Sequence, residues 1–230
     1  MKKLICLLFL SLVIFNIATA QEKLRFGFEV SPFLSWMSSD IKTVESQGGH
    51  LGLNIVADGE YKFGTNYAIR LGLGLSFAQG GSLKHNEING FGNLFPNSNL
   101  SSPSLDSIAH GTIVKYRIQY IEVPFALKMC TPEYGNYKFF AEVPSLFIGF
   151  RTTAQADIGN ATDENITRDA ILINLGWGLG AGVEYSLNSS TSLLAGIYYQ
   201  GGFTDVTKDD GADKNKANTN RVVLRIGVLF

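Results

Sequence analysis

The chain contains 230 residues, with a formal net charge of −1, 45% hydrophobic residues and two cysteines. This near-neutral charge argues against a nucleic-acid-binding surface, and no apolar run beyond residue 20 is long enough for a membrane helix. Only Cys130 follows residue 20, so we expect no intramolecular disulfide, and no motif beside it predicts a cofactor or a catalytic thiol.

The first 20 residues are predicted to be a secretory signal peptide. Lys2 and Lys3 give a positive start, residues 4–17 are almost wholly apolar, and Ala18-Thr19-Ala20 supplies small residues for cleavage. The apolar run is too short for a spanning helix. We therefore expect one mature domain, residues 21–230, and any membrane crossing must use strands.

Eight later segments approach or exceed the roughly 9 to 11 residues that a tilted membrane strand requires. They are residues 24–36, 50–57, 67–78, 114–129, 137–151, 171–185, 193–203 and 221–230. In residues 67–78, an apolar face alternates with a face that contains Arg70 and two glycines. In residues 171–185, the second face is again rich in glycine. Such faces suit the narrow polar interior of a small barrel better than the solvated face of a soluble sheet.

The connections between these segments alternate in length. Four are long and polar (37–49, 79–112, 152–169 and 204–220), and three are short (58–66, 131–136 and 187–191). Long and short connections therefore lie at opposite ends of the sheet. We expect an all-β fold, an eight-stranded antiparallel transmembrane up-and-down β-barrel with long outer loops and short periplasmic turns.

The last strand alternates strictly and ends on Phe230. Val222, Leu224 and Ile226 share one apolar face with Phe230, whereas Arg221 lies on the other face with Arg225. A soluble sandwich would show the same alternation. Aromatic residues near the segment ends favour interfacial girdles, although aromatics also favour strands in general: Trp36, Tyr61, Tyr67, Tyr134, Tyr137, Tyr185, Tyr199 and Phe203.

Residues 120–128, Tyr-Ile-Glu-Val-Pro-Phe-Ala-Leu-Lys, resemble the central strand motif of the PorT-like outer-membrane barrel family of Bacteroidetes. Phe26-Gly27-Phe28 and Glu142-Val143-Pro144 extend the resemblance, and other small OmpA-like and OmpX-like barrels share its remaining features. The resemblance implies an eight-stranded barrel in the outer membrane of a Gram-negative bacterium. The namesake is linked to type IX secretion and gliding. The resemblance also implies that Phe230 is a signal for the barrel assembly machinery.

The two prolines in these motifs predict local irregularity. Because proline cannot donate to a strand ladder, Pro124 and Pro144 are each expected at a bulge or kink. A one-residue bulge near Tyr120 would turn both Tyr116 and Phe125 toward lipid. Arg117 would then point inward together with Glu122.

Strand phase predicts a polar network inside the barrel. Its members are Arg25, Glu29, Asn54, Arg70, Arg117, Glu122, Glu142, Asn174, Glu184, Arg221 and Arg225. Buried charges need partners, and an eight-stranded interior is just wide enough for side chains to fill. We favour an ion-pair plug over a conducting pathway.

Histidines and loop acids offer weaker chemistry. His50, His85 and His110 allow a metal site or a lipid hydrolase with a histidine, serine and acid set, but no spacing supports either. The acidic loop 204–220 lacks the pattern of a calcium site, so a solvated loop is expected. We predict no catalytic, cofactor-binding or metal-binding residues.

Taken together, the sequence predicts a non-enzymatic outer-membrane barrel with a structural or interaction role at the cell envelope. Its expected partners are outer-membrane lipid, the assembly machinery, and a protein or glycan bound by the outer loops, without nucleic acid. A link to secretion or adhesion is left open. The alternatives are a small-solute channel and an outer-leaflet lipid-modifying enzyme.

Overall fold

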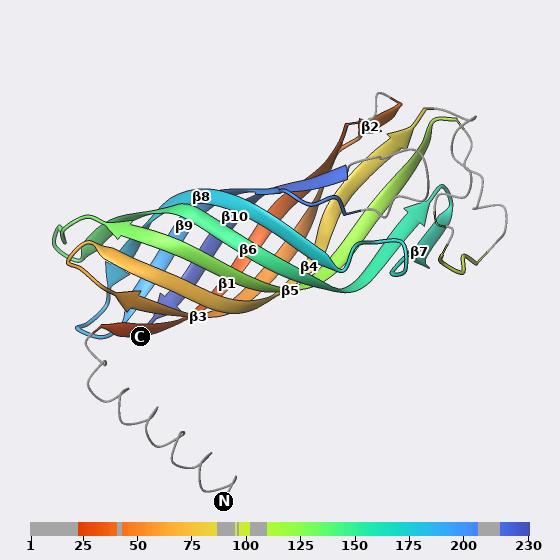
Figure 1. Cartoon of the computed structure of the whole chain (residues 1–230). Helices are drawn as coiled ribbons and strands as arrows, with labels where there is room; N and C mark the ends of the chain where they lie inside the picture. Colours follow the sequence, from red (N-terminus) through yellow and green to blue (C-terminus); the bar gives the residue numbers. More distant parts are fainter. Residues whose placement is uncertain (1–22, 41–42, 87–94, 96, 102–109, 207–216) are drawn as a thin grey trace, which may run out of the picture.

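Eight long strands form a closed antiparallel barrel in the computed structural model, which describes residues 23–40, 43–86, 95, 97–101, 110–206 and 217–230 (Figure 1). The strands are β1 (Leu24–Ser39), β3 (Gly49–Lys62), β4 (Tyr67–His85), β5 (Thr112–Cys130), β6 (Tyr137–Ile158), β8 (Ile173–Ser186), β9 (Ser192–Gly202) and β10 (Ala217–Leu229). Each strand pairs with its neighbours in the chain, and β1 pairs with β10 to close the ring. The predicted fold class is confirmed. Among the described residues, no helix has the length and apolar character needed to cross a membrane.

The barrel carries its apolar side chains on the outside. On β4, Ile69, Leu71 and Leu73 point outward with 38–60% of their surface exposed, whereas Arg70 between them is buried. On β10, the apolar residues predicted to face lipid are exposed and both arginines are buried. This polarity is the reverse of a soluble sandwich, and the exposed belt is far larger than the apolar patches of soluble proteins.

The two ends of the barrel differ. The connections 63–66, 131–136 and 187–191 lie at one end, which we call the short-turn end, and the carboxyl terminus lies there too (Figure 1). Phe230 lies there with Phe26, and the two exchange backbone hydrogen bonds of 3.1 and 2.7 Å. The other end is the long-loop end. The role of Phe230 in assembly stays a prediction.

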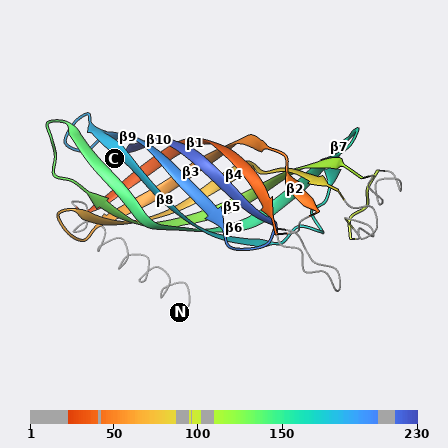
Figure 2. The ribbon, with the colours of Figure 1, turned by 90° about the horizontal axis from the view of Figure 1, so that it is seen from above.

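On one side of the long-loop end, three strands continue beyond the apolar belt. Two short strands join them: β2 (Val44–Ser46) pairs with β4, and β7 (Ala161–Asn165) pairs with β6. The result is a sheet that projects past the other strands (Figures 1 and 2). We call it the extension and define it as β2, β7 and residues 79–85, 112–119 and 152–158. Both short strands lie inside segments that the sequence predicted to be loops.

Bulges set which face of each long strand points inward. The β4–β5 register shifts between Ser76 and Gln79, next to Ala78, whose φ is 59°. The extra residue turns Leu83 and His85 of β4 toward the interior. The apolar pattern of β4 therefore changes face as the strand enters the extension.

The predicted bulge near Tyr120 corrects one part of the sequence interpretation. The register shift is present, but its extra residue is Thr152 of β6, because Gln119 pairs with Thr153 and Tyr120 with Arg151. The phase of β5 is therefore unbroken. Tyr116 and Tyr120 are buried inside the barrel, and Arg117 points outward. The prediction was wrong because it assumed a polar interior along the whole of β5, whereas the interior around Tyr116 and Tyr120 is apolar.

The two motif prolines behave differently. Pro144 follows a cis peptide bond and lies in a register shift between Glu142 and Ser145, as predicted. Pro124 pairs with Phe147 without any register shift, so the prediction of a bulge there was wrong. The pairing of β5 with β4 is interrupted at Pro124, because proline lacks the backbone N–H that pairing would use, but the register is the same on both sides of the gap.

Candidate functional site

Charged side chains at inward positions of the strands form an ion-pair network in the middle of the barrel. We call the following eleven residues the lumen network: Arg25, Arg70, Lys128, Arg221, Arg225, Glu29, Asp58, Glu60, Glu122, Glu142 and Glu184. They come from seven of the eight barrel strands and lie at three levels. Strands β4 and β8 carry glycines at inward positions, so long side chains from the other strands have room to cross the interior.

At the level nearest the short-turn end, two cations and two carboxylates alternate in a ring. Arg25 Nη2 lies 2.7 Å from Glu60 Oε2, and Arg25 Nη1 lies 3.0 Å from Glu184 Oε2. Lys128 pairs with the same two carboxylates from the opposite side. Each charge therefore has two partners of opposite sign, which offsets part of the desolvation cost of burying it.

At the middle level, two arginines bind three carboxylates. Arg70 pairs with Asp58, and its Nη2 lies 2.6 Å from Glu29 Oε2. Arg225 Nη1 donates to both oxygens of Glu142 at 2.9 Å, and its Nε lies 3.2 Å from Glu29. These five side chains form one connected cluster through Glu29, which contacts both arginines.

At the third level, Arg221 crosses the barrel toward β5. Its Nη2 lies 2.8 Å from Glu122 Oε2, and its Nε donates to Gln200 at 2.6 Å. Its guanidinium lies between the rings of Phe33 and Phe147, 5.2 and 5.0 Å from their centroids. Such stacking stabilises a cation that has lost its water.

Ten of the eleven side chains predicted for the interior lie there: Arg25, Glu29, Asn54, Arg70, Glu122, Glu142, Asn174, Glu184, Arg221 and Arg225. Asn54 joins the network by donating to Glu122 at 3.1 Å, and Asn174 accepts a hydrogen bond from Thr204 at 2.8 Å. Arg117 is the exception. It lies outside the barrel wall, paired with Asp157 and Asp163 at 2.7 and 2.6 Å.

Sequence reasoning missed Asp58, Glu60 and Lys128. All three have the phase of residues that were identified, because Asp58 and Glu60 follow Asn54 at even spacing and Lys128 follows Glu122. The predicted strand ends at residue 57 because residues 58–66 are expected to form a short connection, whereas β3 continues to Lys62. Extending the alternation to Lys62 would have found both acids.

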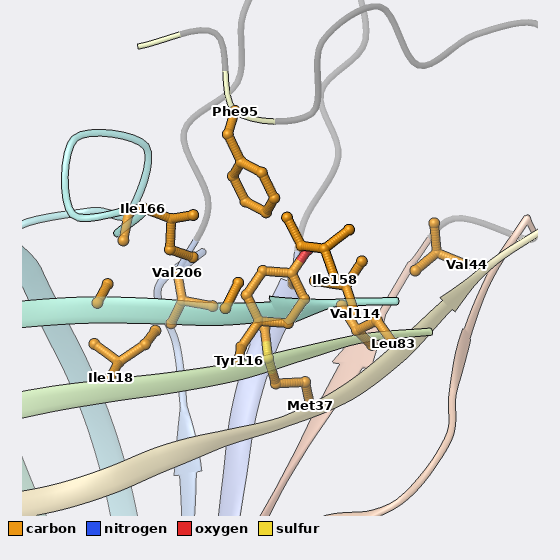
Figure 3. Close-up of a cluster of buried hydrophobic side chains, with 14 of the residues drawn as sticks. Met37, Val44, Leu83, Phe95, Val114, Tyr116, Ile118, Ile158, Ile166 and Val206 are labelled. Carbon is orange, nitrogen blue, oxygen red and sulfur yellow. The ribbon is translucent and has the colours of Figure 1, made fainter. Parts of the chain in front are cut away.

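Above the third level, the interior becomes apolar. The members of this cluster, which we call the cap, are Met37, Val44, Leu83, Phe95, Val114, Tyr116, Ile118, Tyr120, Ala154, Ala156, Ile158, Ile166, Ala170, Val206 and Ala217. Four of them, Phe95, Ile166, Ala170 and Val206, come from connections between the strands. Phe95, Ile166 and Val206 point into the cluster beside strand residues (Figure 3). Phe95 packs edge-on against Tyr116, with ring centroids 6.1 Å apart. The cap therefore fills the interior between the lumen network and the connections of the long-loop end with apolar side chains.

Two buried carboxylates fasten one loop segment over the cap. We call residues 95 and 97–101 the strap. Asp169 accepts hydrogen bonds from the backbone N–H and the side chain of Asn97 at 3.0 and 2.9 Å. Glu164 accepts from the N–H of Ser101 at 2.9 Å and also from its hydroxyl. The connection after β4 is therefore joined to the connection after β6.

The three histidines do not form a common site. His85 is buried in the extension, where desolvation lowers its pKa to about 4, and His110 is exposed. His50 lies elsewhere, with Nε2 3.1 Å from Ser82 Oγ. No group of three metal-binding side chains occurs in the described part of the chain. In the acidic loop, Asp205 accepts a hydrogen bond from the backbone N–H of Ala217. The other acids of that loop, Asp209, Asp210 and Asp213, lie outside the described residues. The predicted signal peptide, residues 1–20, also lies outside them.

The closed barrel, its apolar exterior and its polar interior agree with the sequence comparison. A family model described as "Outer membrane protein beta-barrel domain" matches residues 19–208. The chain belongs to this family. The protein is therefore an outer-membrane β-barrel of a Gram-negative bacterium, and its apolar belt faces lipid.

Solved structures with a similar outline include three small barrels. Neisserial surface protein A is 14% identical, with a TM-score of 0.46, over 89% of this chain and 95% of that chain. OprG from Pseudomonas aeruginosa is 11% identical, with a TM-score of 0.43, over 90% and 97%. Ail, the attachment invasion locus protein of Yersinia pestis, is 12% identical, with a TM-score of 0.39, over 90% and 99%. No curated protein matches the sequence.

Proposed function

We propose that this protein is a non-enzymatic barrel whose sealed wall holds a fixed interaction surface outside the cell. The observation that carries the proposal is the cap, because it builds three connections into the barrel instead of leaving them separate from it. A binding surface made of held segments loses less conformational entropy when a partner binds. The rigid scaffold with functional loops is a common arrangement in proteins.

The cap and the lumen network support this function over the channel alternative. A solute would have to pass the apolar cap and then three levels of paired charges. Breaking a buried ion pair by removing one partner costs about 3–5 kcal/mol, and the network contains several such pairs. Pure protein in liposomes is therefore expected to show no steady, selective conductance.

The outward face of the extension is polar and carries both signs of charge. Arg117, Asp157 and Asp163 form a surface cluster there, with Lys115 directly across from Asp157. A mixed, hydrogen-bonding surface of this kind suits a protein or a glycan rather than a simple anion. The resemblance of residues 120–128 to PorT-like barrels supports a partner from the cell envelope that takes part in secretion.

Loosening the strap tests the proposal. We expect the double variant Glu164→Gln and Asp169→Asn to capture its envelope partner at least about tenfold less well, because the strap loses its charged acceptors. Pull-down from outer membranes measures the capture, and heat-modifiable mobility on denaturing gels checks that the barrel still folds.

The matched control is Ser190→Ala in the turn 187–191, where Ser190 donates to Asn188 at the opposite end of the barrel. This variant should capture the partner normally. If capture fails in the control and survives in the strap variant, the partner binds the short turns and the proposed surface is wrong.

One contact favours a second function, hydrolysis of an ester at the outer surface. His50 Nε2 and Ser82 Oγ are 3.1 Å apart, which is the separation of a nucleophile and its general base. Ser82 lies across from Lys115, a cation that could stabilise an oxyanion. Among the described residues, the ring of His50 makes no hydrogen bond to a carboxylate, so the third member of a catalytic triad is missing.

The test of this second function uses Ser82→Ala and His50→Ala. Release of fatty acid from outer-leaflet lipid by the wild-type protein, lost at least about a hundredfold in both variants, would establish hydrolysis. With no ester cleavage by the wild type, the contact between His50 and Ser82 is structural and the non-enzymatic proposal stands. Lipid analysis by mass spectrometry provides the measurement.

A further inference from the structure

The middle level of the lumen network contains one more carboxylate than it has cations. The other two levels are matched, with two of each sign near the short-turn end and one of each at Arg221. At the middle level, Arg70 and Arg225 face Glu29, Asp58 and Glu142. An unmatched charge in a dry interior is costly, so such groups usually take up a proton instead.

The geometry at Arg70 identifies the carboxylates that are forced together. Asp58 accepts from Nε of Arg70, and Glu29 accepts from Nη2. These two N–H groups point from the same edge of the guanidinium, which normally binds both oxygens of one carboxylate. At Arg70, the two accepting oxygens belong to two different carboxylates. Asp58 pairs with Gly27 across β1 and β3, and Glu29 with Val56, so the two acids are diagonal neighbours on one inner face.

The remaining oxygen of each acid lacks a donor. Glu29 Oε1 and Asp58 Oδ1 are buried and accept no hydrogen bond from a described residue. Glu142, in contrast, receives Arg225 on both of its oxygens. An ionised carboxylate can only accept hydrogen bonds, whereas a protonated one can donate. One proton between the two acids would therefore supply the missing donor.

We propose that Glu29 and Asp58 form a carboxyl–carboxylate pair that holds one proton inside the membrane. Two carboxylates that share one site do not both ionise, because their like charges repel. The proton is taken from water when the barrel folds, and it makes the lumen network neutral, with five cations and five negative charges. The inference concerns the interior and does not depend on the partner proposed for the outer surface.

The charged and titratable groups that face the pair come from four strands. They are Arg70 on β4, Glu142 on β6, Tyr198 on β9 and Arg225 on β10, and Tyr198 accepts a hydrogen bond from Arg225 at 2.7 Å. The β8 side is lined by glycine, including Gly180. Neither arginine loses its charge in the accessible pH range, so the shared proton is the feature of this level that responds to pH.

The shared proton has a consequence for stability with a defined sign. At neutral pH, both acids are ionised in the unfolded chain, so the folded barrel binds one proton more. Stability therefore falls as the pH rises above the ordinary carboxyl range. The unfolding equilibrium constant should increase by up to about tenfold for each pH unit, until the folded barrel also releases the proton.

Amide variants test the pair, because each replaces one acid with a neutral group of the same shape. Glu29→Gln and Asp58→Asn are each expected to unfold in urea with an equilibrium constant within about threefold of wild type at pH 7. Each should also lack the pH dependence, because the proton is no longer needed. The double variant should unfold at least about tenfold more readily, since Arg70 then loses its negative partner.

The matched control is Glu122→Gln at the third level, which removes the carboxylate of Arg221 and leaves the pair intact. We expect this variant to be less stable but to keep the wild-type pH dependence. Infrared spectroscopy should show a protonated carboxyl band in wild type and Glu122→Gln, absent in both single amide variants. A wild-type barrel without that band, or single variants as unstable as the double variant, would overturn the proposal.

Discussion

Arg70→Ala is expected to prevent the barrel from reaching its stable, heat-modifiable form. The guanidinium of Arg70 is almost completely buried and binds Glu29 and Asp58, with Glu142 3.8 Å away. Its removal leaves carboxylates in the membrane interior without their cation. Loss of one partner from a buried ion pair costs about 3–5 kcal/mol, which is a large part of the stability of a typical domain. Urea unfolding in lipid vesicles, followed by tryptophan fluorescence, measures the change.

Arg117→Ala provides the control for this prediction. Arg117 also pairs with two carboxylates, Asp157 and Asp163, but it does so on the outer face of the extension with 28% of its side chain exposed. Exposed ion pairs contribute about 0–1 kcal/mol. Equal destabilisation of the two variants would contradict the assignment of Arg70 to the interior and Arg117 to the exterior.

The contrast between these two arginines shows how far the sequence predicts the site. Alternation identified Arg70 correctly because its strand is regular from Tyr67 to Ser76 and one face is plainly apolar. Arg117 lies in a stretch where both faces contain large side chains. There the inner face of β5 is apolar because it contributes to the cap. Strand phase alone does not indicate that the interior changes from polar to apolar. The prediction assumed a polar interior along the whole barrel.

The cap itself illustrates a second limit. Phe95, Ile166 and Val206 lie in segments whose local sequence is typical of polar connections. Their burial depends on residues brought together by barrel closure, such as Met37 of β1 and Tyr116 of β5. Long-range packing of this kind leaves no periodic pattern in the segment that contributes the side chain. The number of strands, in contrast, was predictable because each strand carries its own alternation.

The inner glycines were predictable as a pattern, but their purpose emerges only from the packing. On β8, Gly176, Gly178, Gly180 and Gly182 all face the interior. Rings from neighbouring strands occupy the space beside them, with Phe147 at Gly176 and Tyr198 at Gly180. Tyr198 in turn lies under Arg225, whose guanidinium carbon is 3.7 Å from the ring centroid. The glycines of β8 thus leave room for the rings of Phe147 and Tyr198, and the ring of Tyr198 supports Arg225 at the middle level of the lumen network.

This packing makes Gly180→Ala the second strongly destabilising change. A methyl group at residue 180 would overlap the ring of Tyr198, which cannot move away without disturbing its hydrogen bond to Arg225. Overpacking of a filled interior typically costs about 1–3 kcal/mol. We expect a lower urea midpoint, measured as for Arg70→Ala.

Gly59→Ala is the matched control for Gly180→Ala, because it makes the same substitution in strand β3. An added methyl there would have its nearest neighbours at 3.9 Å, an ordinary packing distance. Alanine also loses less backbone entropy than glycine on folding, so the control should be at least as stable as wild type. If Gly180→Ala were as stable in urea as Gly59→Ala, the ring of Tyr198 could not be packed against β8. The support for the ion pairs of Arg225 would then have to come from elsewhere.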